Sequence, residues 1–181
     1  MTRGPPGKPA RAPRLGFLGV GWIGRHRMEA VVRSELARIV AVADPNDIRR
    51  AAAAQEFQVP PDRQFRTAEE LAQRPQLADA VINGTMDQHH VPTTLPLLEA
   101  GYHVLLEKPI CQTRADLLTL LQTALRTGRH LMIGHVLRYA PFYVGIRQQV
   151  LAGAIGRIMH LHSEEAVSYH HWAAAFVRGR W

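Results

Sequence analysis

Short apolar runs alternate with longer amphipathic segments along most of the chain. Between residues 14 and 135 the apolar runs have the length of strands, and each is followed by a segment with helical spacing of its apolar residues. This alternation is typical of parallel strands joined by covering helices, so we predict an α/β fold of the Rossmann type, a doubly wound parallel sheet. The predicted strands lie near residues 15–19, 39–44, 80–83, 103–107 and 130–135, and the predicted helices near 23–34, 46–57, 67–73, 88–100 and 113–126.

The pattern changes after His135. From residue 136 the sequence predicts one helix, a glycine turn, and a strand from Ile158 to Val167 whose apolar residues recur with a period of two. A strand of this length needs neighbouring strands to pair its backbone N–H and C=O groups. We therefore predict that residues 14–135 form one domain and that residues 136–181 are the beginning of an α+β domain.

The chain is basic, but the excess charge is concentrated at its amino end. The 181 residues carry a formal net charge of +7, of which Arg3, Lys8, Arg11 and Arg14 leave only +3 for the rest. Residues 1–13 are rich in proline and have no apolar period, so we expect a disordered basic tail. A basic tail is not a basic folded surface, and this argues against nucleic-acid binding.

The sequence also favours a cytoplasmic protein that does not associate with membranes. Its uncharged apolar runs fall short of the roughly 20 residues needed to cross a bilayer, and no apolar secretion signal follows the basic tail. The single cysteine, Cys111, excludes an internal disulfide. We interpret Cys111 as a core residue because no base is arranged beside it in the sequence pattern.

The first predicted strand runs into the sequence GVGWIG at residues 19–24, which opens the first predicted helix. In this context Gly19 permits a tight turn, Gly21 allows the backbone to approach a pyrophosphate, and Gly24 allows close packing of the helix on the sheet. The N–H groups and the positive dipole end of the helix start attract phosphate. We therefore predict a dinucleotide-binding site that includes Gly19, Gly21, Trp22, Ile23 and Gly24.

Asp44 ends the second predicted strand, 20 residues after Gly24. A carboxylate at this position accepts hydrogen bonds from the adenosine ribose hydroxyls and repels a 2′-phosphate, so the predicted cofactor is NAD. Arg49 and Arg50 keep NADP as a less favoured option. The alternative interpretation is a glycine-rich turn followed by an aspartate that caps a helix.

A second group of polar residues follows the third and fourth predicted strands. Thr85, His90, Glu107 and Lys108 lie just beyond the ends of these strands. Ligands of doubly wound sheets bind at the carboxyl ends of the strands, so we expect these residues to converge where a nicotinamide ring would lie. Pro109 disfavours a helical backbone at Lys108 and so helps to fix its direction.

Four motifs link these observations: GVGWIGRHR at residues 19–27, ADPN at 43–46, LLEAGYHVLLEKPI at 97–110, and RYAPFY followed by GAIGRI between 138 and 158. Together they resemble the Gfo/Idh/MocA oxidoreductase family, and the resemblance covers nearly everything after the tail. The family usually has Thr-Pro-Asn, with a histidine five residues past the threonine. This sequence has Thr85-Met86-Asp87 instead, with His90 in the histidine position.

The resemblance implies roles for several residues. It places Lys108 beside the reacting carbinol of a sugar or polyol, assigns Glu107 and Thr85 to the cofactor site, and provides an arginine, here Arg138, at the rim of the crevice. Elementary chemistry agrees for Lys108, because hydride transfer from a secondary alcohol requires removal of the hydroxyl proton. Without the resemblance, Glu107 and Lys108 would be interpreted as an ordinary surface ion pair.

The resemblance also implies a second domain with a large open sheet, which binds substrate and often builds a homo-oligomer. We find no match in residues 136–181 to the family's later catalytic acid and histidine, so we expect a truncated form of low activity. His160 and His162 share a face of the predicted strand, and we interpret them as part of a sheet face and not as a metal site.

The sequence therefore predicts an NAD-dependent oxidoreductase that transfers a hydride between the cofactor and a hydroxyl of a small sugar or polyol substrate. Two alternatives stay open at this point. One is a dinucleotide-binding module without catalysis, and the other is a glycosidase of the same family that uses NAD transiently.

Overall fold

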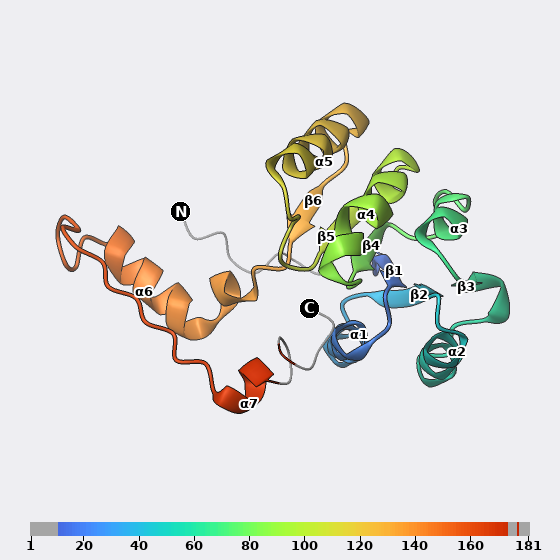
Figure 1. Cartoon of the computed structure of the whole chain (residues 1–181), viewed down its shortest axis with the longest axis horizontal. Coiled ribbons are helices and arrows are strands. Elements are labelled where there is room, and N and C mark those ends of the chain that lie inside the picture. Colours follow the sequence, from blue (N-terminus) through green and yellow to red (C-terminus); the bar gives the residue numbers. More distant parts are fainter. Residues whose placement is uncertain (1–10, 174–176, 178–181) are drawn as a thin grey trace. The chain divides into compact units, whose positions relative to one another are not determined.

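A computed structural model describes residues 11–173 and residue 177 of the chain, which divides into two compact units between Gly134 and His135. The first unit contains one parallel sheet with the strand order β3-β2-β1-β4-β5-β6 (Figure 1). Its strands are β1 (Arg14–Leu18), β2 (Arg38–Ala43), β3 (Gln64–Phe65), β4 (Ala80–Asn83), β5 (His103–Leu106) and β6 (Leu131–Ile133). The strand order reverses between β1 and β4, which confirms the predicted doubly wound fold.

The helices of this unit confirm the predicted alternation. They are α1 (Trp22–Ser34), α2 (Asp47–Glu56), α3 (Ala68–Ala72), α4 (His90–Glu99) and α5 (Arg114–Thr127), with short 3₁₀ turns η1 (Pro61–Arg63) and η2 (Asp87–His89). Three helices begin at a polar cap whose side chain accepts the backbone N–H three residues on: Asn46, Thr67 and Thr113. The two-residue strand β3 was not predicted from the sequence, because two residues are too few to show a period.

Two apolar cores, one on each face of the sheet, hold these layers together. Successive strand residues point to opposite faces, so Phe17 packs into one core and Leu18 into the other. The core around Phe17 includes Met28 of α1 and two alanines of α2. The core around Leu18 includes side chains of α3, α4 and α5, among them Leu71, Leu97 and Leu120.

An ion pair between Arg14 and Asp79 links the amino ends of β1 and β4. The Asp79 carboxylate accepts a hydrogen bond from the backbone N–H of Arg14 at 2.7 Å and another from the Arg14 guanidinium at 2.9 Å. Arg11 donates to the same carboxylate at 2.9 Å. Hydrogen bonds from Arg14 are the main reason why the pKa of Asp79 lies well below its usual range.

The second unit contains η3 (Val136–Tyr139), α6 (Pro141–Leu151) and α7 (Tyr169–Trp172). The prediction of a strand from Ile158 to Val167 is wrong, because these residues form no regular element. A period of two only becomes a strand when a neighbouring strand pairs with its backbone, and the described part of this unit contains no strand.

Two further expectations concern the ends of the chain and the membrane. The predicted basic tail falls largely on residues 1–10, which lie outside the described residues. Within residues 11–173, no helix combines the length and the apolar character that crossing a bilayer requires.

We expect Asp79→Asn to lower the free energy of unfolding at pH 7 by about 1–2 kcal/mol, because it weakens hydrogen bonds to a partly exposed carboxylate. The folded state lowers the pKa of Asp79, so this contribution is complete above the pKa of a free aspartate, about 3.9. It decreases below that pH and disappears only below the lowered pKa of the folded state, so a smaller difference is expected at pH 3. Urea denaturation of both proteins at pH 7 and pH 3 tests this. An equal difference at both pH values would contradict it.

Candidate cofactor and active site

The glycine turn between β1 and α1 is shaped by close backbone contacts. Gly19 has a φ of +78°, and a Cβ there would lie 2.8 Å from the backbone of Gly84. A Cβ on Gly24 would lie only 2.1 Å from the carbonyl oxygen of Gly19. These two glycines are therefore required for the turn itself to form.

Gly21 differs from both, because a Cβ at this position would have no protein atom within 4 Å. Gly21 is the N-cap of α1, and its helix has neither a capping side chain nor an acidic residue in the first turn. Trp22 is exposed, whereas Gly24 is buried. The start of α1 thus presents N–H groups and a positive dipole end beside open space, which fits a phosphate-bearing ligand.

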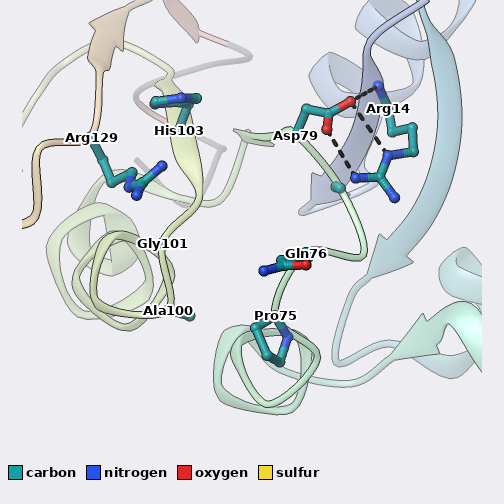
Figure 2. Close-up of a pocket in the computed structure, with 9 residues that line it drawn as sticks. Arg14, Pro75, Gln76, Asp79, Ala100, Gly101, His103 and Arg129 are labelled. Atoms are coloured by element: carbon teal, nitrogen blue, oxygen red, sulfur yellow. Dashed lines mark hydrogen bonds and ion pairs between the residues drawn. The ribbon is translucent and has the colours of Figure 1, made fainter.

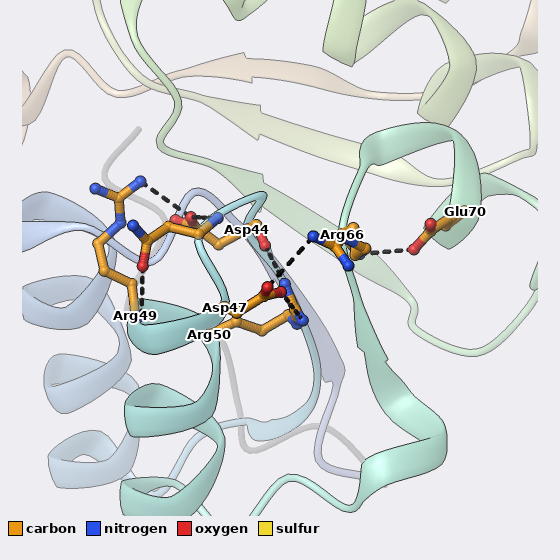
Figure 3. Close-up of polar contacts among 7 residues, drawn as sticks. Asp44, Asp47, Arg49, Arg50, Arg66 and Glu70 are labelled. Atoms are coloured by element: carbon orange, nitrogen blue, oxygen red, sulfur yellow. Dashed lines mark hydrogen bonds and ion pairs between the residues drawn. The ribbon is translucent and has the colours of Figure 1, made fainter.

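Asp44 joins the end of β2 to the glycine turn. Asp44 is 2% exposed, and its Oδ2 accepts the backbone N–H of Val20 at 3.0 Å. Oδ1 accepts the N–H of Asn46 at 2.9 Å and a guanidinium hydrogen of Arg49 at 3.0 Å (Figure 3). A carboxylate has about four acceptor positions, so Asp44 retains the capacity to accept a ribose hydroxyl.

More arginines surround this carboxylate than the sequence pattern alone indicates. Arg50 donates to the carbonyl oxygen of Asp44 at 2.7 Å and to Asp47 at 2.6 Å. The guanidinium of Arg66, which follows β3, also donates to Asp47, and the backbone N–H of Arg66 donates to the carboxylate of Glu70 (Figure 3). The end of β2 therefore combines a buried carboxylate with a half-exposed guanidinium, that of Arg49.

The loop after β4 is held by a buried asparagine. Asn83 is fully buried, and its Oδ1 accepts hydrogen bonds from the backbone N–H of Thr85 at 3.2 Å and from its hydroxyl at 2.8 Å. The Asn83 amide donates to the hydroxyls of Thr93 and Thr94 of α4, at 2.9 Å each. Sequence analysis missed Asn83, although a polar residue at the end of the apolar run AVIN was a usable signal.

His90 connects this loop to the segment that carries Lys108. The ring is 1% exposed; Nδ1 lies 2.6 Å from the carbonyl oxygen of Pro109, and Nε2 lies 3.1 Å from that of Thr85. The Lys108–Pro109 peptide bond is cis. The structure therefore brings His90 together with Thr85 and Pro109, and both ring nitrogens face backbone oxygens of the protein.

Glu107 pairs with an arginine of α1 and not with its neighbour Lys108. Glu107 is 7% exposed, and its Oε1 accepts a hydrogen bond from Arg27 Nε at 2.8 Å and lies 2.8 Å from Arg27 Nη2 in the same ion pair. Gly134 leaves room for this carboxylate, because a Cβ there would lie 3.1 Å from it. The Glu107–Lys108 ion pair considered from the sequence is absent from the ion pairs of the described residues.

Lys108 is exposed at the carboxyl edge of the sheet, next to the buried Glu107. Among the described residues, no ion pair or side-chain hydrogen bond engages its ammonium group. Arg27 was missed by sequence analysis, although it lies one turn after Gly24 and faces the sheet edge. Arg138 belongs to the second unit, so its place at the crevice rim stays a prediction.

The glycine turn and the polar residues at the carboxyl edge of the sheet lie in a segment that matches a known protein family. Residues 13–135 match an oxidoreductase family with an NAD-binding Rossmann fold. The chain belongs to the Gfo/Idh/MocA family. The glycine turn, Asp44 and the Glu107-Lys108-Pro109 segment all lie within the matched residues, and the resemblance noted from the sequence is confirmed.

Relatives within the Gfo/Idh/MocA family extend well beyond this chain. Inositol 2-dehydrogenase of Corynebacterium glutamicum is 30% identical over 154 residues, which cover 84% of this chain and 45% of the relative. A putative myo-inositol dehydrogenase of Sinorhizobium meliloti is 29% identical with a TM-score of 0.71, over 80% of this chain and 42% of that one. The chain thus spans less than half the length of these relatives.

One further solved structure supports the fold alone. Scyllo-inositol dehydrogenase of Lactobacillus casei, crystallised with NAD(H) and scyllo-inositol, has a TM-score of 0.76 and 23% sequence identity, over 82% of this chain and 43% of that one. Its similarity extends over the doubly wound sheet of this Gfo/Idh/MocA member.

Two glycine variants should separate folding from cofactor binding. We expect Gly24→Ala to lower the free energy of unfolding by about 2 kcal/mol or more, because the new Cβ collides with backbone. Gly21→Val should change it by less than about 1 kcal/mol but weaken NADH binding by at least about tenfold, because it fills the space beside the helix start. Urea denaturation and NADH fluorescence titration measure the two effects. Equal effects of both variants on both quantities would contradict the assignment.

Proposed function

We propose that this chain carries the NAD-binding half of an oxidoreductase that transfers a hydride between the nicotinamide and a hydroxyl of a sugar, polyol or related small molecule. The observation that carries the proposal is the buried link between Asp44 and the glycine turn, which places a carboxylate beside an uncapped helix start. This pair of groups fits the ribose hydroxyls and the pyrophosphate of one dinucleotide. Family membership and the dehydrogenases among the relatives support it.

Each part of the site has a distinct task in this proposal. The N–H groups at residues 21–24 hold the pyrophosphate, and Asp44 accepts the adenosine ribose hydroxyls. Thr85, positioned by Asn83 and His90, lines the nicotinamide side. Glu107, held by Arg27, closes the space between α1 and the end of β5.

Lys108 is the residue that we assign to proton transfer. The nicotinamide accepts or returns a hydride when the cofactor is bound. Oxidation of an alcohol also releases the hydroxyl proton, and the Lys108 amine is an exposed donor and acceptor at the same sheet edge. In the oxidation direction a neutral Lys108 Nζ takes this proton, and in the reduction direction the ammonium returns it to the carbonyl oxygen.

The experiment has two steps on the full 181-residue chain. NADH binding is measured by fluorescence titration, and NADH formation is then followed with myo-inositol, scyllo-inositol and glucose as substrates. Binding with turnover supports the oxidoreductase. Binding without turnover favours a dinucleotide-binding module, and sugar release from glycosides without net NADH formation favours a glycosidase. Absence of NAD and NADH binding would refute the proposal.

Cofactor choice should depend on Asp44 and Arg49 in opposite ways. We expect Asp44→Ala to weaken NADH binding by at least about tenfold, because it removes the acceptor for the ribose hydroxyls. Arg49→Gln should change NADH binding by less than about threefold but weaken NADPH binding further, because the half-exposed Arg49 guanidinium beside Asp44 is the nearest partner for a 2′-phosphate. Titrations of both cofactors with both variants test this. A preference for NADPH in the unaltered chain would contradict the assigned role of Asp44.

Lys108→Met should separate binding from chemistry. We expect NADH affinity to stay within about twofold, because Lys108 makes no contact that holds the cofactor loop. With any substrate that the unaltered chain oxidises, kcat should fall by about 10²- to 10⁴-fold, the usual contribution of a positioned acid or base. Steady-state assays with the matched exposed-site variant Arg33→Gln as control measure this. A kcat within threefold of the unaltered chain would exclude Lys108 from proton transfer.

A further inference from the structure

A polar cleft opens at the amino edge of the sheet, at the opposite ends of the strands from the glycine turn. Its volume is about 430 Å³, within the usual range for small-molecule sites. Loops before β4, β5 and β6 and the start of β1 form its walls. Figure 2 shows the Arg129 guanidinium and the Gln76 amide extending into it from different sides, with His103 at one border and the Asp79–Arg14 pair at another.

The ion pairs leave the cleft with a surplus of positive charge. Asp79 is the carboxylate among its lining residues, and it is already paired with both Arg14 and Arg11. Arg129 is exposed, and its guanidinium has no ion pair among the described residues. Arginine presents N–H groups in a planar fork that matches phosphate and carboxylate oxygens.

His103 contributes a second donor whose direction is fixed by its neighbour. Its Nδ1 lies 2.9 Å from the backbone N of His130, which donates a hydrogen bond to it. Nδ1 is therefore an acceptor, so the neutral ring carries its proton on Nε2. Burial, together with His130 and Arg129, lowers the pKa of His103, which keeps the ring in this form at neutral pH.

Helix ends oppose this positive charge only in part. α3, α4 and α5 end beside the cleft, at Ala72, Glu99 and Thr127, and a helix carboxyl end carries roughly half a negative charge. The Arg126–Glu99 ion pair already joins the ends of α4 and α5. Arg129 contributes one positive charge, and the two arginines paired with Asp79 leave one more. Together these exceed the partial negative charges of the three helix ends.

We propose that this cleft is a binding site for a small phosphate-bearing anion, whose phosphate oxygens accept hydrogen bonds from Arg129, His103 Nε2–H and the Gln76 amide. The volume exceeds that of a phosphate group alone, so an organic phosphate of the size of a triose phosphate fits. The site is separate from the proposed dinucleotide site and does not depend on the proposed function.

The test is a ¹H–¹⁵N NMR titration of the full chain with inorganic phosphate and with glycerol 3-phosphate, at constant ionic strength set with chloride. We expect saturable shifts at the amides of Gly101, His103 and Arg129. The start of α1 also attracts phosphate, so the titration is repeated with saturating NADH. Shifts at the cleft should persist in its presence, while those at residues 19–24 should not.

Three variants identify the donors. Arg129→Gln should weaken phosphate binding by at least about tenfold, because it removes the positive charge and the planar set of N–H donors of the guanidinium. His103→Asn keeps an acceptor for the His130 N–H but loses the distal N–H, and binding should weaken by about threefold or more. Arg33→Gln, an exposed arginine near the end of α1, is the matched control and should bind as the unaltered chain does. Circular dichroism verifies that each variant is folded.

The two ligands decide what the cleft recognises. If glycerol 3-phosphate binds more tightly than inorganic phosphate, the cleft also contacts the glycerol group. If both bind equally, the cleft recognises the phosphate group alone. Both outcomes support the proposal. Three outcomes would overturn it: no saturable shift at the cleft, shifts confined to residues 19–24, or an equal loss of affinity in Arg129→Gln and Arg33→Gln.

Discussion

The buried hydrogen bond from the Val20 N–H to the Asp44 carboxylate is the interaction on which the site depends. It joins the end of β2 to the turn after β1, where Gly19 and Gly24 leave no space for any side chain. Burial of a carboxylate is costly unless its oxygens are bonded. Asp44 accepts one hydrogen bond from the turn, one from the N–H of Asn46 in its own loop, and one from the Arg49 guanidinium of α2. The same residue thus fixes the turn and, in the function proposed above, accepts the ribose hydroxyls.

The remaining candidate residues are also positioned by bonds between segments that are distant in sequence. Arg27 holds Glu107, and His90 contacts the backbone of Pro109, so that α1, α4 and β5 meet at the carboxyl edge. In the same region, both the oxygen and the NH₂ group of the buried Asn83 side chain have hydrogen-bond partners. Buried polar groups whose partners are all present define one conformation, which is what a rigid cofactor site requires.

The sequence predicted the scaffold better than these contacts, for physical reasons. Short apolar runs that alternate with amphipathic segments located five of the six strands, and the spacing from Gly24 to Asp44 located the proposed ribose carboxylate. The bond between Arg27 and Glu107 spans 80 residues, and periodicity carries no information on such pairing. The error at Ile158–Val167 has a related origin, because an alternating pattern describes one strand and says nothing about whether a neighbour is present to pair with it.

The departure from the family pattern at Met86 and Asp87 shows which contacts hold the loop after β4. Here Asp87 begins the 3₁₀ turn η2, and its buried Oδ1 has no hydrogen-bond partner among the described residues. Thr85, by contrast, donates hydrogen bonds from its N–H and its hydroxyl to Asn83 Oδ1, and its carbonyl oxygen lies next to His90 Nε2. These contacts come from β4 and α4, so the position of Thr85 does not rest on the side chains of residues 86–87.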